Sequence, residues 1–228
     1  MDRLAIIPAR GGSKRIPRKN IRPFLGRPVI AYSIAAARAS GLFDRVIVST
    51  DDEEIAAVAR ANGAEVPFLR SAANSDDHAT TLDVVREVLD RVGVAYEAVC
   101  CLYAAAPLVT AELIGRTYWR LVDGAFDSVF PAVRYGFPPQ RAVRIEATGR
   151  MTMLEPRHLT TRSQDLEPIY HDAGMLYWLR PGPVLASNRL WTDNSACVPL
   201  GELEAQDIDT PGDWQLAELK YQLLHDGR

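Results

Sequence analysis

The sequence has few of the features that mark secreted, membrane or nucleic-acid-binding proteins. It holds three cysteines in 228 residues, Cys100, Cys101 and Cys197, without metal-site spacing. We expect them to be reduced core residues of a cytoplasmic protein. The apolar runs fall far short of the ~20 residues that span a membrane, and the N-terminal run is too short for a signal peptide. The net charge of −3 argues against nucleic acid or an anionic membrane as a general partner.

Two common nucleotide-binding motifs are also missing. The glycines near the N-terminus do not fit the P-loop pattern G-x-x-x-x-G-K-[ST], and the dinucleotide fingerprint G-x-G-x-x-G is absent. The missing fingerprint counts against an NAD-dependent dehydrogenase. The sequence has neither internal repeats nor low-complexity segments, and its length suits one domain that spans residues 1–228.

What the sequence does have is an alternation of strand-like and helix-like segments. Short apolar runs predict strands at 4–8, 45–49, 98–103, 128–133 and 174–179, with a short one near Val66. Helical spacing predicts helices at 28–39, 52–61, 80–91, 111–121 and 211–224. The predicted fold class is therefore α/β, with three α/β/α layers in a Rossmann-like order and a mainly parallel sheet. Expected core residues include Trp178 and Trp214, and the apolar positions of the last helix are Trp214, Leu216, Ala217, Leu219 and Leu223.

The alternation breaks between about residues 134 and 172. Four prolines punctuate this region and polar residues dominate it, yet AVRI and MTML look like short strands. The composition is too ordered for a linker. We interpret the segment as an insertion that forms an arm, a lid or an oligomer contact.

Positive charge is concentrated behind two glycines in the segment ARGGSKRIPRKN, which follows the first predicted strand. A loop at this place lies at the carboxyl edge of the sheet, where open α/β sheets bind ligands. Gly11 and Gly12 would let backbone N–H groups approach an anion and form a nest. Ser13 adds a hydroxyl donor, while Arg10 and Lys14 add charges that suit phosphate. The alternative is a solvated basic loop, which is the expectation for the more distal residues Arg15, Arg18 and Arg22.

Two carboxylates near the C-terminus are candidates for a metal site. Asp207 and Asp209 are two residues apart and would point to the same side of an extended backbone. Mg²⁺ prefers a few carboxylates together with water and substrate phosphates. Thr210 and Asp213 predict a capped helix start directly behind the pair. The alternative is that both acids only serve the helix entry, and spacing alone does not separate the two interpretations.

Four motifs, taken in order, resemble one family. They are IPARGGSKRIPRKNI, VIVSTDDEEIA, RSAANSDDHATT and QDIDT, and together they extend over nearly the whole chain. This pattern resembles the acylneuraminate cytidylyltransferases, the CMP-sugar synthetases for nine-carbon acidic sugars. The resemblance implies a nucleotidyltransferase fold with an inserted arm and a homodimer.

The resemblance also assigns roles to matching residues. It implies nucleotide contacts along the glycine-rich segment and in the segment that follows Arg70, and a divalent cation such as Mg²⁺ on Asp207 and Asp209. Arg10, Lys14 and Asp209 are the implied catalytic residues, with Asp209 nearer the reacting centre. The implied nucleotide-binding residues are Ala9, Gly11, Gly12, Ser13, Lys19, Asn20, Arg70 and Asp76.

Departures from the sialic-acid enzymes indicate a different sugar. Tyr103 stands where those enzymes have the Gln that contacts the sugar, and it is followed by Ala104 and Ala105. HDAG replaces their Arg-Pro-Asn-Gly, and His171 and Gln164 are candidate sugar contacts. Gln164 lies in the insertion, so it could instead contact a partner. PFLRSAANSDD and TRSQDLEPIYHDAG are more similar to the pseudaminic acid branch.

The implied reaction joins CTP to the anomeric hydroxyl of a nine-carbon acidic sugar, most like pseudaminic acid, and releases pyrophosphate. CTP and the sugar are therefore the expected small-molecule partners. Sialic or legionaminic acid is the alternative substrate. A nucleotide-binding relative without transfer chemistry is the alternative of a different class, which the presence of Arg10, Lys14 and both aspartates disfavours.

Overall fold

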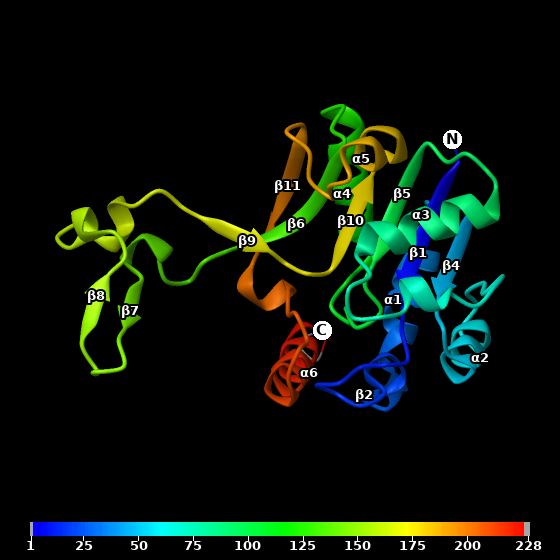
Figure 1. Ribbon diagram of the computed structural model, residues 1–228, viewed down its shortest axis with the longest axis horizontal. Coiled ribbons are helices and arrows are strands. Elements are labelled where there is room, and N and C mark those ends of the chain that lie inside the picture. Colours follow the sequence, from blue (N-terminus) through cyan, green and yellow to red (C-terminus); the bar gives the residue numbers. More distant parts are fainter. Residues whose placement is uncertain (1, 226–228) are drawn as a thin grey trace.

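A seven-stranded sheet organises the chain in the computed structural model, which describes residues 2–225 (Figure 1). The strand order is β11-β6-β10-β5-β1-β4, and β9 pairs with β6. Strands β9 and β10 run antiparallel to their neighbours, and the remaining pairs are parallel. The mainly parallel sheet is thus confirmed. The strands are β1 (Arg3–Pro8), β4 (Arg45–Ser49), β5 (Ala98–Leu102), β6 (Ser128–Arg134), β9 (Tyr170–Asp172), β10 (Leu176–Leu179) and β11 (Ser195–Leu200).

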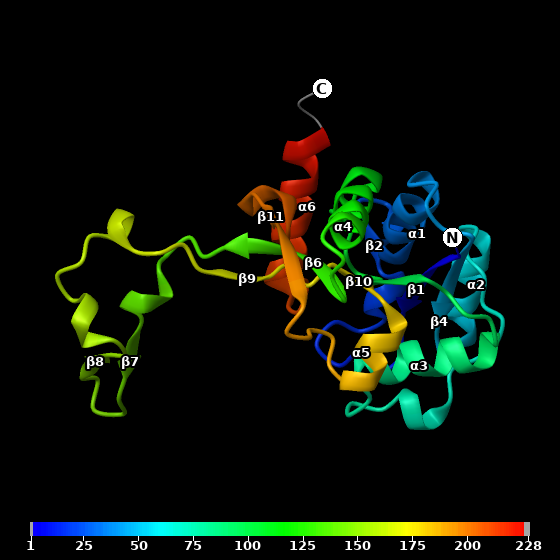
Figure 2. The same cartoon turned by 90° about the horizontal axis from the view of Figure 1, so that it is seen from above.

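Helices cover both faces of this sheet, as Figure 2 shows from above. In β1, Ala5 and Ile7 face the core that contains α1, α2 and α4. Leu4 and Ile6 face the opposite core, with α3 and α5. Because both sides of β1 are buried, its sequence is continuously apolar. The helices are α1 (Val29–Ala39), α2 (Glu53–Ala61), α3 (Thr81–Val92), α4 (Ala111–Asp123), α5 (Pro181–Ser187) and α6 (Pro211–His225).

Several short elements were not predicted from the sequence. They are β9, α5, β11 and the hairpin of β2 (Pro23–Phe24) and β3 (Arg27–Pro28). Helix α5 begins PGP, which has little helix propensity. Strand β11 contains Pro199, which is tolerated because this strand lies at the sheet edge. The strand expected near Val66 is only an isolated bridge between Ile47 and Glu65.

Two predictions about burial were partly wrong. Cys100 and Cys101 are buried in β5, but Cys197 is exposed because alternate residues of edge strand β11 face solvent. In α6, Trp214 and Ala217 are buried against the hairpin and Ile208. The other expected apolar positions of α6 are exposed, namely Leu216, Leu219 and Leu223. Trp178 is fully buried, as predicted.

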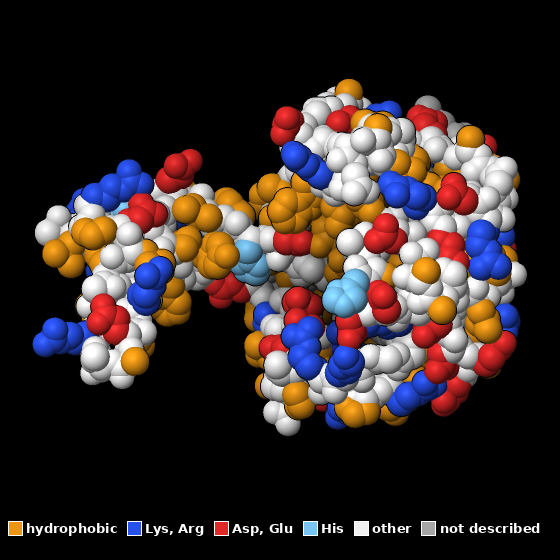
Figure 3. All heavy atoms as spheres, in the orientation of Figure 1, with side chains coloured by type: hydrophobic (Ala, Val, Ile, Leu, Met, Phe, Trp, Pro, Cys, Tyr) orange, Lys and Arg blue, Asp and Glu red, His pale blue; other side chains and the backbone are white. Residues whose placement is uncertain are grey.

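The insertion projects from the body as an arm (Figure 1). The chain leaves the sheet at the end of β6 and returns through β9, which pairs Arg134 with Tyr170. The arm carries a small hairpin of β7 (Val143–Ile145) and β8 (Met151–Met153). Figure 3 shows hydrophobic side chains gathered on it, and Phe137 and Ile145 are 91% and 74% exposed. Across residues 2–225, none of the helices has the length and apolar character needed to cross a membrane.

Candidate functional site

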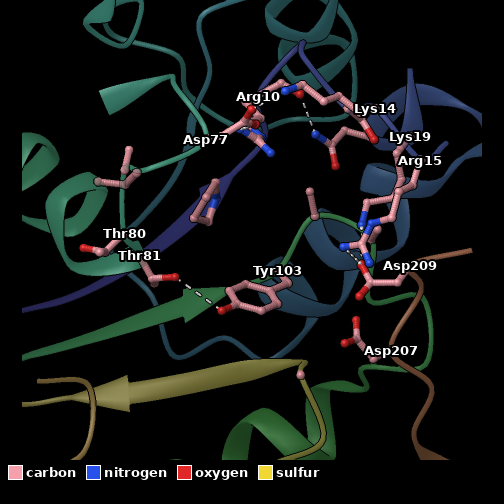
Figure 4. A pocket seen from close by; sticks show the side chains of 18 of the residues that line it. Arg10, Lys14, Arg15, Lys19, Asp77, Thr80, Thr81, Tyr103, Asp207 and Asp209 are labelled. Carbon is pink, nitrogen blue, oxygen red and sulfur yellow. Dashed lines mark hydrogen bonds and ion pairs between the residues drawn. The ribbon is translucent and has the colours of Figure 1, made fainter. Parts of the chain in front are cut away.

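An open cavity of about 470 Å³ lies at the carboxyl ends of β1 and β5 (Figure 4). This is the edge at which parallel sheets bind ligands, and the size suits a small molecule. Side chains reach the cavity from the loop after β1, the start of α3, the loop after β5 and the segment before α6. The polar and charged lining residues are Arg10, Ser13, Lys14, Arg15, Lys19, Asn20, Arg70, Asp77, Thr80, Thr81, Tyr103, Asp207 and Asp209.

Most of the predicted site residues meet in this cavity. Those that line it are Arg10, Ser13, Lys14, Lys19, Asn20, Arg70, Tyr103, Asp207 and Asp209, and they come from segments up to about 200 residues apart. The predicted residues outside its lining are Ala9, Gly11, Gly12, Asp76, Gln164 and His171. Four further lining residues were not predicted as site residues from the sequence, namely Arg15, Asp77, Thr80 and Thr81.

Two basic side chains at the rim share one acidic partner. Arg10 Nη1 lies 2.8 Å from Asp77 Oδ1, and Lys14 Nζ pairs with the other oxygen of Asp77. Hydrogen bonds from Lys14 and then Arg10 lower the pKa of Asp77. The rim therefore holds two cations whose charge a single carboxylate partly neutralises.

Asp76 does not line the cavity, whereas the adjacent Asp77 does. The Asp76 carboxylate accepts the backbone N–H groups of His78 and Ala79, each at 2.8 Å, and so shapes the turn. Only its carbonyl oxygen contacts the rim, where it accepts from Arg10 at 3.0 Å. The adjacent acid Asp77 faces the cations instead. The doubled acid in NSDDHA is the sequence signal that could have raised this possibility.

The glycine pair does not form the expected nest of free N–H groups. The Gly11 N–H donates to Asp51 Oδ1 at 2.9 Å, and the Ser13 N–H donates to the Gly11 carbonyl at 3.0 Å. Gly11 is required for close approach, since a Cβ there would lie 2.8 Å from Asp52 Oδ2. Around Gly12 there is open space. The charges at the rim therefore come from side chains rather than from a backbone cradle.

Lys19 and Asn20 brace the basic loop. The buried Asn20 side chain donates from Nδ2 to the carbonyl of Arg10 at 2.9 Å. Lys19 Nζ donates to the carbonyl of Ile208 at 2.8 Å and lies 3.8 Å from Asp209. Burial lowers the pKa of Lys19, while the charge of Asp209 works in the opposite direction. Lys19 thus ties the first loop to the segment before α6.

Arg70 places a buried positive charge at the back of the cavity. Its Nε donates to Ser49 Oγ at 3.0 Å, and its Nη2 donates to the Ser49 carbonyl. Burial lowers the pKa of Arg70. These bonds fasten the segment after β4 to the end of that strand.

The two predicted carboxylates both line the cavity, as their spacing implied (Figure 4). Arg15 Nη2 lies 2.7 Å from Asp209 Oδ1. Behind the pair, the Asp213 carboxylate accepts the N–H groups of Asp209 at 3.1 Å and Thr210 at 2.7 Å. The predicted capped start of α6 is confirmed, and it holds the carboxylates on a helix terminus.

The donor set of this pair fits a divalent cation. Asp207 is open on its cavity side, yet partial burial of its carboxylate and then the charge of Asp209 raise its pKa. Within residues 2–225, no side chain donates a hydrogen bond to the Asp207 carboxylate, and no group of three or more His, Cys, Asp or Glu could hold a metal ion. The chain would therefore supply two carboxylates, and the other ligands of Mg²⁺ would be water and phosphate oxygens.

The cavity floor combines one tyrosine with two alanines. The Tyr103 hydroxyl lies 3.3 Å from Thr81 Oγ1, and burial raises the pKa of Tyr103. Its ring contacts Tyr177 at a centroid distance of 5.5 Å. Ala104 and Ala105 continue the lining. This part of the cavity is less polar than the rim.

Comparisons with known proteins identify the family of this chain. The family model described as cytidylyltransferase matches residues 4–186, which span the basic loop, the Asp77 segment and the tyrosine floor. The chain belongs to the cytidylyltransferase family.

Two curated relatives and one solved structure are similar to this cytidylyltransferase over nearly its whole length. A pseudaminic acid cytidylyltransferase of Campylobacter jejuni is 41% identical over 99% of both chains. A CMP-N,N'-diacetyllegionaminic acid synthase of Legionella pneumophila is 34% identical over 94% of both chains. The structure of a CMP:2-keto-3-deoxy-manno-octonic acid synthetase complexed with CTP matches with a TM-score of 0.72 at 16% identity, and it covers 99% of this chain and 100% of that one. The last match shows the shared fold.

Two predicted sugar contacts lie elsewhere in this cytidylyltransferase. Gln164 is on the arm, beside residues 134–139 and 200–202. His171 is exposed, and its ring lies 4.9 Å from that of Tyr135. It lines a neighbouring hollow, which meets the main cavity at Asp207. Neither residue lines the main cavity of its own chain. Gln164 lies out on the arm, whereas His171 lies in β9, where it pairs with Val133 of β6.

The ion pairs of Asp77 predict that this carboxylate competes with a polyphosphate for Arg10 and Lys14. In Asp77→Asn, the two cations lose their charged partner, so inorganic triphosphate should bind about twofold to fivefold more tightly than to the unmodified chain. Isothermal titration at low salt measures this. Asp90→Asn, which removes an exposed charge from α3, is the control. Unchanged or weaker binding by Asp77→Asn alone would show that Asp77 does not compete.

Proposed function

We propose that this chain transfers CMP from CTP to the anomeric hydroxyl of pseudaminic acid and releases pyrophosphate. The observation that carries the proposal is the placement of Arg10 and Lys14 across one cavity from Asp207 and Asp209. Cations suit the triphosphate, and the carboxylates suit Mg²⁺. The choice of sugar rests on the relative of that name, with 41% identity over 99% of both chains.

In the proposed reaction, the anomeric hydroxyl attacks the α-phosphorus of CTP in line, and pyrophosphate leaves. Arg10 and Lys14 exchange Asp77 for the phosphates and stabilise the charge that develops on the leaving group. Mg²⁺, when bound by Asp207 and Asp209, would neutralise phosphate charge and lower the pKa of the attacking hydroxyl. Asp209 is the carboxylate assigned to the reacting centre. Lys19 and Asn20 keep the basic loop in place.

The less polar floor supports a sugar with fewer hydroxyl groups. Tyr103 offers one hydroxyl, and Ala104 and Ala105 offer methyl groups where the sialic-acid enzymes are more polar. Pseudaminic acid is a deoxygenated, doubly amino-substituted nine-carbon acid, so this surface suits it. Sialic or legionaminic acid is the alternative acceptor.

The arm supports a homodimer. Exposed apolar side chains are costly to leave in water when they are gathered on one projecting segment. In a dimer, the arm would place Gln164 near the partner chain, which gives this predicted sugar contact a place to act. A cytoplasmic location stays a prediction that rests on cysteine usage.

The substrate proposal predicts the outcome of a two-sugar assay. With CTP and Mg²⁺, pyrophosphate release should be fast with pseudaminic acid and near background with N-acetylneuraminic acid, because the floor lacks polar partners for the extra hydroxyl groups. A coupled pyrophosphate assay measures both rates. Release with N-acetylneuraminic acid alone would retain the enzyme class but refute the sugar. Nucleotide binding without release for any nine-carbon acid would favour the non-catalytic alternative.

The mechanism predicts that Arg10 contributes to the chemical step. Arg10→Ala should lower kcat about a hundredfold, since the developing charge on pyrophosphate loses a preorganised donor. Steady-state kinetics with varied CTP separates kcat from KM. Arg45→Ala removes an arginine that pairs with Glu65 outside the cavity and should keep wild-type kinetics. An unchanged kcat in Arg10→Ala would remove Arg10 from the catalytic residues.

The proposed dimer predicts a change in mass when the arm is made polar. Phe137→Asp combined with Ile145→Asp should convert a dimer into a monomer, because two highly exposed apolar side chains lose their burial. Sedimentation equilibrium gives the mass. Val94→Asp, at an exposed position in the loop before β5, is the matched control on the body. A wild-type chain that sediments as a monomer contradicts the proposal directly.

A further inference from the structure

A short turn between β9 and β10 joins the cavity floor to the Asp207 carboxylate. Asp172 ends β9, and its Oδ1 accepts the N–H of Gly174 at 2.9 Å. Its other oxygen accepts the hydroxyl of Tyr177, a buried residue of β10. One carboxylate thus holds both the turn and the strand that follows it. Asp172 itself does not line the main cavity.

Gly174 and Asp207 both line the cavity, and Gly174 leaves room for the Asp207 carboxylate. The φ of Gly174 is +64°, in the left-handed region, which favours glycine. A Cβ at this position would lie 3.1 Å from Asp207 Cγ and 3.3 Å from its Oδ2. Both distances are shorter than ordinary van der Waals contact. The carboxylate therefore occupies space that a side chain at position 174 would need.

The backbone on either side of Gly174 is fixed. The Ala173 N–H donates to the Pro131 carbonyl at 3.0 Å, and the Met175 carbonyl accepts the Tyr103 N–H at 2.9 Å. Both flanking residues are buried. The turn is thus anchored to β6 and to the end of β5. If a side chain were added at Gly174, Asp207 would have to move rather than the turn.

Tyr177 extends this connection to the floor. Its ring contacts Tyr103, whose hydroxyl lies 3.3 Å from Thr81 Oγ1 at the start of α3. Thr81, Tyr103 and Gly174 line the cavity, whereas Tyr177 and Asp172 stand behind it. A chain of contacts therefore connects Thr81 at the start of α3, through Tyr103 and Tyr177, to the turn beside the Asp207 carboxylate.

We infer that Asp172 and Gly174 are positioning residues that set the place of the Asp207 carboxylate, and through it the affinity of the cavity for a divalent cation. The inference rests on the proposed function, in which Asp207 is a ligand of the cation. Gly174 acts by leaving room for the carboxylate. Asp172 acts by holding the turn with its Gly174 and Tyr177 hydrogen bonds. Residues that orient metal ligands in this way commonly alter affinity 10- to 100-fold when changed.

The test is a titration of the CTP-bound protein with Mn²⁺. The concentration of free Mn²⁺ is measured by its electron paramagnetic resonance signal, and the Mn²⁺ bound in a titration of CTP alone is subtracted. Gly174→Ala should weaken Mn²⁺ binding at least about tenfold. Gly41→Ala is the matched control, because Gly41 has a φ of +63° and open space around it. It carries the same backbone strain without the contact and should bind Mn²⁺ as the unmodified chain does.

Changes at Asp172 separate hydrogen bonding from charge. Asp172→Ala loses both bonds and should weaken Mn²⁺ binding about tenfold. Asp172→Asn keeps an oxygen that accepts from Gly174 and should bind close to the unmodified chain. If Gly174→Ala fails to fold, which a thermal melt beside Gly41→Ala reveals, Asp172→Ala and Tyr177→Phe carry the test.

Asp207→Ala in the same titration separates the metal role of Asp207, which belongs to the proposed function, from the positioning role of Asp172 and Gly174. Unchanged Mn²⁺ affinity in Asp207→Ala would refute the metal role of Asp207, and with it this inference. Weaker binding in Asp207→Ala, together with control-like binding in Gly174→Ala and Asp172→Ala, would retain the metal role and overturn the inference. Equal losses in Asp172→Asn and Asp172→Ala would also overturn it, because charge rather than the hydrogen-bonded turn would then be responsible.

Discussion

The pairing of opposite charges in one cavity is the interaction on which the candidate site depends. Cations from the loop after β1 and carboxylates from the segment before α6 meet at one edge of the sheet, where ion pairs join several of them. Asp77 pairs with both Arg10 and Lys14, and Arg15 pairs with Asp209. Lys19 lies between the two groups and bonds to the backbone beside Asp209. Without such pairing, the like charges on each side would repel one another and disfavour the folded chain.

The parallel strands make this meeting possible. Because β1, β4 and β5 run in the same direction, the loops that follow them reach the same edge. The reversed strand β10 brings a turn back to that edge and places Gly174 against Asp207. Segments far apart in the sequence therefore share the cavity.

The layers and most of the cavity could be predicted from the sequence, since apolar runs and helical spacing are local signals. The roles of Asp76 and Asp77 could not, because two adjacent acids look equivalent until the turn directs one to its own backbone. The glycine nest failed for a similar reason, since the acceptor for the Gly11 N–H is Asp51, which is distant in sequence. Cys197 was misplaced because the edge position of β11 depends on the complete strand order. The motifs were enough to predict the family. The ion pairs of Asp77 with Arg10 and Lys14, and of Arg15 with Asp209, could be seen only in the folded chain.

The bond between Asp77 and the rim has a consequence for ligand selection. A carboxylate tethered beside its cations acts at a high effective concentration, so a competing anion must displace an intramolecular partner. A monatomic ion such as chloride offers only one point of contact and does so poorly, whereas a chain of linked phosphates offers many oxygens and can engage both cations at once. Asp77 therefore favours the binding of polyanions at Arg10 and Lys14 over the binding of small anions from the surrounding solution.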